Sequence, residues 1–347
     1  MTGEVQIHEC SGVVGAAGRA NGVEMASVPG LESGTVERLR EAGLDMGTVV
    51  RAVRTALDED FRYGPDVTSA ATVAGRRVTA DVVAREDGVL AGLPVALAVL
   101  DLIAGYLGAE VRGGAAEADG IVATALAADG ERVRAGDAVL RVSGPAAAVL
   151  GAERTMLNFL THLSGVATAT RTWADVIDGT GALVRDTRKT TPGLRVLEKY
   201  AVRCGGGSNH RMGLGDAALI KDNHIAAAGG VAAAVTAVLS AAGHSAAGHS
   251  AGAGLVVEVE CDSVAQVRAA LDAGARFLLL DNMPAAVLRE AVAVARRQPG
   301  VRLEASGGLQ LSNAREIAQT GVDYLAVGAL THSSRALDLG LDFAAES

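Results

Sequence analysis

The sequence predicts an α/β barrel preceded by a separate domain built from short strands. The chain has 347 residues, which is enough for a large barrel and a smaller second domain. After Gly181, short apolar strands alternate regularly with Ala-rich amphipathic segments, as expected for βα units and a parallel sheet. Glycine-rich turns occur only late in this series, which disfavours a dinucleotide-binding fold with its glycine-rich first turn.

The N-terminal part predicts a weakly ordered extension, one helix and a set of short strands. Residues 1–45 are rich in Gly, Ser and Glu without sustained periodicity, so we expect them to be disordered or weakly ordered. Met46–Asp60 has apolar residues at helical spacing. Val78–Gly144 consists of short strands and turns, and Pro145–Gly181 is predicted to be a long helix.

The stretch GERVRAGDAVLRVSG (130–144) resembles half of a lipoyl or biotinyl carrier domain. Such a carrier attaches its cofactor to an exposed lysine, and no lysine precedes Lys189. A carrier function is therefore excluded, and only a sandwich-like architecture remains.

Composition excludes several classes of partner. The net charge is −9, which argues against binding to nucleic acid or to a membrane surface. The uncharged stretch Ile225–Gly243 and the stretch Gly88–Gly108 are expected to be buried helices rather than membrane spans. Cys10, Cys204 and Cys261 have no metal-ligand spacing, and their odd number favours a reducing cytoplasm.

Lysine is confined to one segment of the chain. Only Lys189, Lys199 and Lys221 are present, against 28 arginines spread over the whole length. A basic cluster in an acidic protein predicts a site for a small anion. Lys199 lies between charged neighbours in a helical stretch, so we expect it on a solvated face without ligand contacts.

Polar residues follow the ends of six predicted barrel strands. The carboxyl ends of barrel strands meet at the active-site face, so these side chains should surround one mouth. The residues are Thr187 with Arg188, Lys221, Glu260, Asp281, Ser306 and Gly328.

Two acidic strand-end residues form a candidate catalytic pair. Glu260 and Asp281 end neighbouring strands, and such a pair can hold ribose hydroxyls, a hydrated Mg²⁺ or a developing positive charge. Glu258 points to the same face as Glu260 and fits either a functional role or that of a satisfied core group.

Two turns predict a phosphate site. Glu304–Leu309 and Ala326–Ser333 place small residues between a strand and a helix, where backbone N–H groups can cradle a phosphate. The last strands of a barrel are the usual position for such a site.

A cationic cluster is expected opposite these turns, formed by Arg188, Lys189, His210, Arg211 and Lys221. His210 fits a structural role as well as a catalytic one. The acidic pair, the phosphate-binding turns and the cationic cluster together predict a small polyanion and a phosphosugar as substrates.

The chain resembles the quinolinate phosphoribosyltransferase family over most of its length. The resemblance lies in motifs that run in order from about Tyr63 to Ser333: YGPDVTS, REDGVLAG, ERTMLNFLTHLSGVAT, the continuous stretch Arg185–Ile225, EVEC, LLLDNM, EASGGL and GVDYLAVGALTHS. It implies transfer of a phosphoribosyl group from phosphoribosyl pyrophosphate to quinolinate, with release of CO₂, in de novo NAD synthesis.

The resemblance also implies a fold and its domains. It implies an incomplete (β/α) barrel of the type II phosphoribosyltransferase kind over residues 157–329, with an N-terminal α/β sandwich over 46–156. Residues 330–347 are expected to pack back on the sandwich. The implied unit is a cytoplasmic homodimer in which each sandwich covers the partner's barrel mouth.

Roles for single residues follow from the same resemblance. Quinolinate is expected to contact Thr187, Arg188, His210, Arg211 and Lys221, together with Arg154 from the partner subunit. Phosphoribosyl pyrophosphate is expected to contact the catalytic residues Lys189, Glu260 and Asp281, and the phosphate-binding residues Ser306, Gly307, Gly308 and Gly328. Mg²⁺ is expected to arrive with this substrate, with Glu260 and Asp281 as its candidate protein ligands.

Three alternatives stay open. A related phosphoribosyltransferase would act on nicotinate or another monocarboxylate, but the number of cations favours a dicarboxylate. A phosphate-binding barrel lyase or isomerase would place a catalytic Lys or Glu in the mouth without the arginine cluster. A small-molecule sensor would not need the acidic and basic groups that are present.

Overall fold

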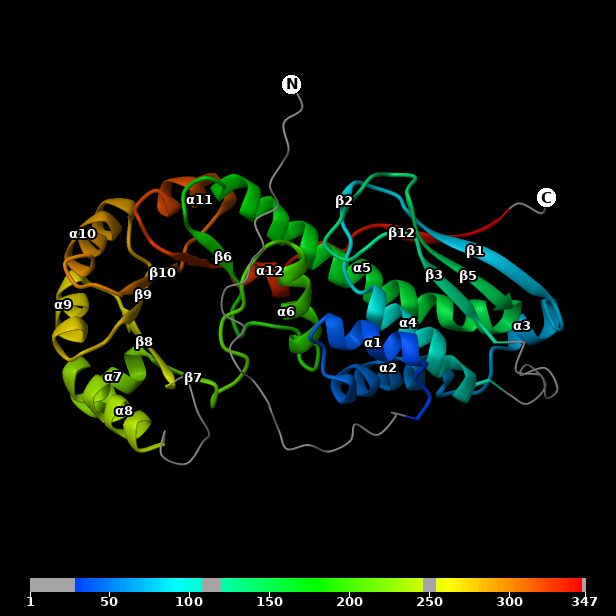
Figure 1. The fold of residues 1–347 in the computed structure, drawn as a ribbon, viewed down its shortest axis with the longest axis horizontal. Helices are drawn as coiled ribbons and strands as arrows, with labels where there is room; N and C mark the ends of the chain where they lie inside the picture. The colour runs from blue at the N-terminus through cyan, green and yellow to red at the C-terminus, as the bar shows by residue number, and fades with distance from the viewer. Residues whose placement is uncertain (1–28, 108–119, 246–253, 345–347) are drawn as a thin grey trace, which may run out of the picture.

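The computed structural model describes residues 29–107, 120–245 and 254–344. Most of the predicted N-terminal extension and Cys10 lie outside these ranges. So does the second copy of AAGHS, a five-residue sequence that occurs twice over residues 241–250. The described chain forms two lobes, which share the long helix α5 (Ala146–Ile177) (Figure 1).

The N-terminal lobe is an antiparallel sheet covered by helices. The sheet has the order β12-β1-β5-β3, formed by β1 (Arg77–Ala84), β3 (Val122–Ala125), β5 (Ala138–Pro145) and β12 (Leu339–Phe343). Short strands β2 (Gly88–Val89) and β4 (Arg132–Val133) pair separately. The helices of this lobe are α1 (Ser33–Glu41), α2 (Met46–Phe61), α3 (Val67–Thr72), α4 (Leu93–Leu102) and the 3-10 turn η1 (Ile103–Gly105).

The second lobe is an open α/β barrel. Its strands are parallel in the order β6-β11-β10-β9-β8-β7. They span Leu183–Arg185 (β6), Ala217–Ile220 (β7), Val256–Cys261 (β8), Phe277–Asp281 (β9), Arg302–Ser306 (β10) and Tyr324–Ala326 (β11). Strands β6 and β7 lie at opposite edges of this sheet, so the barrel is incomplete, as the family resemblance implied, rather than closed.

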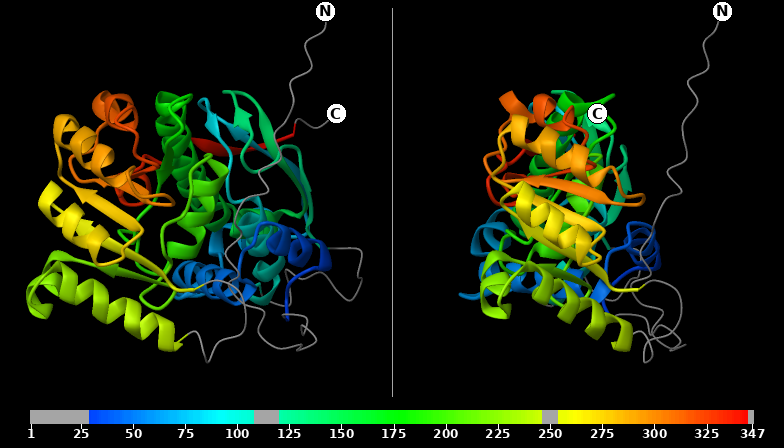
Figure 2. Two further views of the ribbon diagram at one scale, coloured as in Figure 1. Left: turned by 60° about the vertical axis from the view of Figure 1, so that its left-hand side comes forward. Right: turned by 90° about the vertical axis from the view of Figure 1, so that its left-hand side faces the viewer.

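Helices cover the outside of the barrel sheet, as the views in Figure 2 show. They are α6 (Arg195–Cys204), α7 (Asp222–Ala228), α8 (Val231–Ser245), α9 (Val264–Asp272), α10 (Ala285–Ala295), α11 (Leu311–Ala318) and α12 (Ala329–His332). The core between the layers consists almost entirely of Leu, Val, Ile and Ala, which is how a chain with 3% aromatic residues fills it.

Three expectations from the sequence need correction. Residues 33–41 are not disordered but form α1, because Leu39 packs into the core and the Glu32 N–H donates to Asp101 Oδ2 at 2.9 Å. The proposed domain boundary at 156/157 falls inside α5, which is one continuous helix of 32 residues. The stretch Ile225–Gly243 is not one buried helix, because it breaks into α7, which has no buried residue, and α8, of which one face is buried and the other exposed.

No single helix in the described ranges is long and apolar enough to span a membrane. One pair, Asp222–Ala228 with Val231–Ala242, passes the length and composition test only when taken together, and it is bent by 94°.

The C-terminal segment crosses α5 before it joins the N-terminal sheet. Strand β12 pairs antiparallel with β1, with Ala84 opposite Leu339 and Ala80 opposite Phe343. At the crossing, a methyl group on Gly165 would lie 2.2 Å from the carbonyl oxygen of Arg335. Glycine is therefore required at this point of an otherwise regular helix.

We expect Gly165→Ala to destabilise the protein by at least about 2 kcal/mol, since the new methyl group must push the backbone at Arg335 away from α5. In an open helical position the same change stabilises by up to about 1 kcal/mol. Gly34→Ala in α1 is the matched control, since nothing lies within 4 Å of its new methyl group. Denaturant unfolding of both variants measures the difference, and a stabilised Gly165→Ala protein would contradict the crossing.

Candidate active site

The carboxyl ends of the barrel strands surround a cavity of about 620 Å³. Ten residues that the sequence predicted for the site line this one cavity: Thr187, Arg188, Lys189, His210, Arg211, Lys221, Glu260, Asp281, Ser306 and Gly307. They lie at or just after the carboxyl ends of β6, β7, β8, β9 and β10, or in the loop between α6 and β7. The convergence arises because parallel strands deliver their carboxyl ends to one edge.

One side of the cavity is cationic. Arg188, Lys189, Arg211 and Lys221 line it together. The buried Nε of Arg188 has no hydrogen-bond partner among the described residues, and Arg211 Nη1 donates to the carbonyl of Ala217 at 3.2 Å. Burial and the charge of Arg188 lower the pKa of Arg211. Because like charges are held together here, this side of the cavity favours an anionic ligand.

The carboxylates of Glu260 and Asp281 line the same cavity. Burial and the neighbouring charge of Asp281 raise the pKa of Glu260, although Lys221 acts in the other direction. Asn282 follows Asp281 and donates from Nδ2 to Asp281 Oδ2 at 2.8 Å, which orients that carboxylate. Two adjacent carboxylates favour a ligand that brings positive charge or several hydroxyl donors.

The turn after β10 is built around the same asparagine. The Asn282 N–H donates to the carbonyl of Ser306 at 2.8 Å, and Asn282 itself has a φ of 53°. Gly307 has a φ of +79°, and a methyl group there would lie 2.2 Å from Asn282 Oδ1. Only glycine fits this turn, which leaves its backbone open to the cavity.

His210 lies at the cavity wall with both ring nitrogens engaged inside the protein. The Arg211 N–H donates to His210 Nδ1 at 2.7 Å, so the ring proton of the neutral imidazole must sit on Nε2. Nε2 lies 2.9 Å from Glu258 Oε2 and 3.5 Å from Glu304 Oε1. Burial lowers the pKa of His210 to about 4, so the ring stays neutral. His210 lines the cavity, and its expected contact with a substrate carboxylate stays a prediction.

Beneath His210, two carboxyls are buried. Burial raises the pKa of Glu258 and of Glu304 to about 7, and one oxygen of each has no hydrogen-bond partner within the described ranges. Arg185 Nη1 donates to Glu304 Oε2 at 2.6 Å. The atoms of Glu258, Glu304 and His210 lie within 4.8 Å of one another, a spacing that a metal ion would tolerate. The Arg185 guanidinium already neutralises Glu304, so a shared proton satisfies this group better than a further cation.

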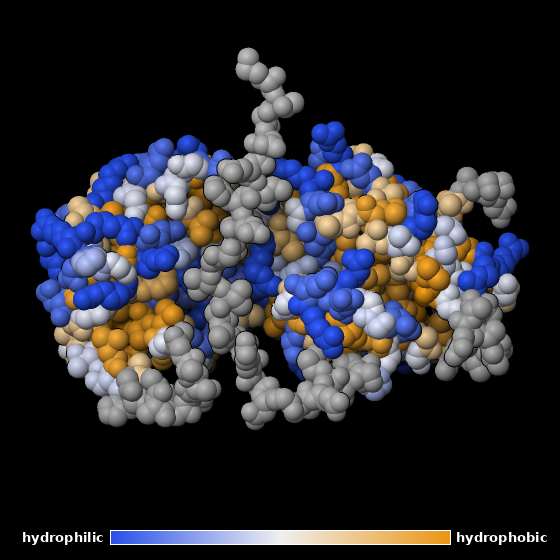
Figure 3. Space-filling model, in the orientation of Figure 1, coloured by the Kyte–Doolittle hydropathy of each residue, from blue (hydrophilic) through white to orange (hydrophobic). Residues whose placement is uncertain are grey.

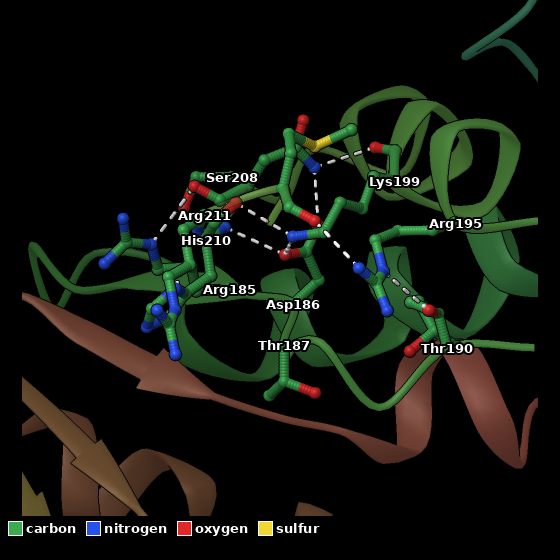
Figure 4. Close-up of polar contacts among 12 residues, drawn as sticks. Arg185, Asp186, Thr187, Thr190, Arg195, Lys199, Ser208, His210 and Arg211 are labelled. Atoms are coloured by element: carbon green, nitrogen blue, oxygen red, sulfur yellow. Dashed lines mark hydrogen bonds and ion pairs between the residues drawn. The ribbon is translucent and has the colours of Figure 1, made fainter. Parts of the chain in front are cut away.

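Helix α6 holds the cationic loops from behind (Figure 4). Lys199 is fully buried and forms an ion pair with Asp186, so the expected solvated face is wrong. Lys199 Nζ donates to the carbonyl of His210 at 2.8 Å, and the His210 N–H donates to Asp186 Oδ1 at 2.8 Å. Burial acts to raise the pKa of Asp186 and to lower that of Lys199, while their pairing acts in the opposite direction on both.

Three predicted residues lie outside the cavity. Arg154 is exposed on α5 in the other lobe and is not among the residues that line it. Gly308 faces a neighbouring hollow beyond the turn. Gly328 packs behind Lys189, where a methyl group would lie 3.1 Å from Lys189 Cδ and 3.4 Å from Thr187 Oγ1. Its small size makes room for these two side chains.

Four residues of the site were not predicted: Arg185, Asp186, Asn282 and Glu304. Asp186 and Asn282 are next to predicted residues, and Arg185 and Glu304 begin two of the motifs that carry the family resemblance, so their positions were a signal. The sequence does not show that Asp186 points toward α6 and that Glu304 points into the barrel, since both could be ordinary strand residues.

The comparisons with known proteins agree with this geometry. The family model described as the C-terminal domain of quinolinate phosphoribosyl transferase matches residues 166–342, and the model of its N-terminal domain matches 66–164. The chain belongs to the quinolinate phosphoribosyltransferase family. The junction between the two models lies within α5, eight or more residues beyond the expected boundary.

Relatives of this family match over nearly their whole length. The nicotinate-nucleotide pyrophosphorylase (carboxylating) of Mycobacterium leprae is 52% identical over 84% of this chain and 95% of its own. A probable enzyme of the same name from Bacillus subtilis is 38% identical over 82% and 89%. The solved structure of the Francisella tularensis nicotinate-nucleotide pyrophosphorylase has a TM-score of 0.75 at 36% identity, covering 87% of this chain and 98% of that one.

We expect Gly307→Ala to destabilise the protein by at least about 2 kcal/mol and to abolish phosphate binding, because the methyl group displaces Asn282 and the turn. Gly308→Ala is the control. It has a similar left-handed φ of +61°, but its methyl group lies 4.0 Å from Asn282 Oδ1, so only conformational strain of about 1–2 kcal/mol is expected. Thermal unfolding with and without inorganic phosphate measures both effects. Equal losses in the two variants would show that the contact with Asn282 is unimportant.

Proposed function

We propose that this protein transfers the 5-phosphoribosyl group of phosphoribosyl pyrophosphate to quinolinate and releases pyrophosphate and CO₂. The product is nicotinate mononucleotide, on the de novo route to NAD. The observation that carries this proposal is the meeting of a cationic side, a carboxylate pair and a glycine turn in one cavity. A cytoplasmic location is part of the proposal and is supported by the free thiols of Cys204 and Cys261.

The cationic side suits a planar dicarboxylate. Guanidinium groups bind carboxylates through paired N–H donors, and Arg188 and Arg211 provide two such groups in the cavity. Lys221 adds a third cation, so each acceptor carboxylate can meet a positive charge. Fixing both carboxylates holds the ring nitrogen toward the sugar and makes the attack effectively intramolecular.

The remaining side chains suit the phosphoribosyl donor. Ser306 and Gly307 would hold the 5′-phosphate through the turn after β10, and Lys189 would face the pyrophosphate. As the bond between C1 and pyrophosphate breaks, positive charge develops on the ribose. The fixed carboxylates of Glu260 and Asp281 stabilise that charge, because they are already oriented before the reaction.

The Glu260–Asp281 pair also fits Mg²⁺. Both offer hard oxygen ligands at the cavity wall. Burial and the charge of Asp281 raise the pKa of Glu260, and a cation between the two carboxylates would relieve their repulsion. Bound there with the pyrophosphate group, Mg²⁺ supplies neutralisation of the leaving group.

Decarboxylation follows from the same arrangement. After the ring nitrogen bonds to C1, the bond between ring carbon 2 and its carboxylate breaks, CO₂ leaves, and a proton takes its place on carbon 2. The electron pair that remains briefly on the ring lies beside the cations of Arg188 and Arg211.

A monocarboxylate acceptor such as nicotinate is the alternative. It would leave part of the cationic side unpaired, so we expect turnover with quinolinate to exceed turnover with nicotinate by at least about 100-fold. Purified protein, phosphoribosyl pyrophosphate and Mg²⁺ with either acceptor, followed by detection of nicotinate mononucleotide and CO₂, makes the comparison. Product from nicotinate alone would replace the proposal by that alternative, and product from neither would remove it.

We also propose a homodimer in which Arg154 completes the cationic side of the partner's cavity. Arg154 is exposed in the N-terminal lobe, away from the cavity of its own chain. Large apolar side chains are exposed in both lobes. Tyr63 is 93% exposed and Val67 74% in the N-terminal lobe, and Leu214, in the loop after Arg211, is 75% exposed. On the face shown in Figure 3, hydrophobic residues gather on parts of both lobes. Exposed groups of this kind support an interface between copies.

A mixing experiment tests the shared site. Arg154→Ala and Arg211→Ala proteins should each lose most activity through a raised KM for quinolinate, because each removes a cation from the acceptor site. Mixed and allowed to exchange subunits in equal amounts, they should recover about a quarter of wild-type activity, since half of the dimers contain one intact site. Recovery should be absent for either variant alone. No recovery despite subunit exchange, shown by a tagged subunit, would place Arg154 outside the partner's site.

A further inference from the structure

Helix α6 lies between the two loops that carry the cationic side chains. The first loop, residues 186–194, joins β6 to α6 and carries Thr187, Arg188 and Lys189. The second loop, residues 205–216, joins α6 to β7 and carries His210 and Arg211. The spacing between these loops sets the spacing of the cations in the cavity.

Arg195, the first residue of α6, bridges the two loops directly. Its Nε donates to Thr190 Oγ1 in the first loop at 3.0 Å. Its Nη1 donates to the carbonyl of Met212 in the second loop at 2.9 Å (Figure 4). One guanidinium therefore fixes both loops, each within two residues of an arginine of the acceptor site.

Lys199 repeats this arrangement one helical turn deeper. Four residues after Arg195, it lies on the same side of the helix. It reaches Asp186 in the first loop and the carbonyl of His210 in the second. Glu198, also buried, accepts from the Thr191 N–H at 3.0 Å and holds the end of the first loop against α6.

The cationic side needs such restraints because its members repel one another. Arg188 and Arg211 share the cavity wall, and the charge of Arg188 disfavours the charged form of Arg211. Without a bridge, the two loops would relax apart before a ligand binds. A ligand with two carboxylates would then have to draw the arginines together, and the free energy needed to do so would weaken its binding.

We propose that Arg195 and Lys199 are positioning residues that set the Arg188–Arg211 spacing and thereby select a dicarboxylate acceptor. Neither touches the substrate, and both act through the loops that they join. This inference rests on the proposed function. Arg195 is the better residue to test, because it is half-buried, whereas Lys199 is fully buried and its replacement leaves Asp186 without its cation.

Arg195→Met should raise the KM for quinolinate by about tenfold or more, the equivalent of one lost charge-assisted hydrogen bond. The KM for phosphoribosyl pyrophosphate at saturating quinolinate should rise less than the KM for quinolinate, because Lys189 alone among the expected contacts of that substrate lies on these two loops. Inhibition by nicotinate, which has one carboxylate, should weaken less than quinolinate binding does. Arg195→Lys keeps one donor and should fall between wild type and Arg195→Met.

Arg315→Met is the matched control. Like Arg195, Arg315 makes two hydrogen bonds through its guanidinium, here from Nη1 to the carbonyls of Val176 and Asp178, but these lie at the end of α5 that leads into β6, away from the mouth. It should lower the melting temperature without changing either KM. If Arg195→Met behaves like Arg315→Met, or weakens quinolinate and nicotinate equally, the positioning role is wrong. Failure of the wild-type protein to turn over quinolinate would instead remove the proposed function, so the two failures are distinguishable.

Discussion

The ion pair between Asp186 and Lys199 is the interaction on which the mouth of the barrel depends. Asp186 directly follows the edge strand β6, and Lys199 lies on α6, so the pair joins the end of the strand to the helix that returns behind the sheet. Together they bind the N–H and the carbonyl of His210, which leaves that residue almost no freedom. A buried pair of this kind contributes little net stability, but removing either partner leaves an unpaired buried charge. Its role is to fix the position of the His210 backbone at the mouth.

The fold holds like charges close together on both sides of the cavity. Arg188 and Arg211 repel each other on one side, and Glu260 and Asp281 repel on the other. Both arrangements cost stability in the free protein, and a ligand of opposite charge relieves that cost. An acceptor with two carboxylates and a donor that develops positive charge relieve both at once. The rigid loops around α6 keep the groups from relaxing apart, so the site is prepared before binding.

Much of the fold and of the cavity lining could be predicted from the sequence. The six barrel strands follow from regular apolar runs, and their polar ends identify ten residues of the mouth. Lys199 shows why the rest could not be predicted. Charged neighbours indicated a solvated helix face, but Glu198 and Lys199 turn inward because Asp186, Thr191 and His210 lie opposite them. Such partners are distant in sequence or separated by a loop, and local periodicity says nothing about them. The two roles of His210's nitrogens depend on the same tertiary placement.

The return of the chain to β1 has a consequence for synthesis on the ribosome. Strand β1 is made early, yet one of its edges pairs only with β12, which begins at Leu339. Throughout translation of the intervening barrel, that edge presents free N–H and carbonyl groups, which is the surface through which nascent sheets associate wrongly. The barrel, whose strands are all made before β12, can assemble first. Synthesis of the N-terminal lobe therefore starts first and its sheet is completed last. A chain released before β12 has been made would leave one edge of β1 unpaired.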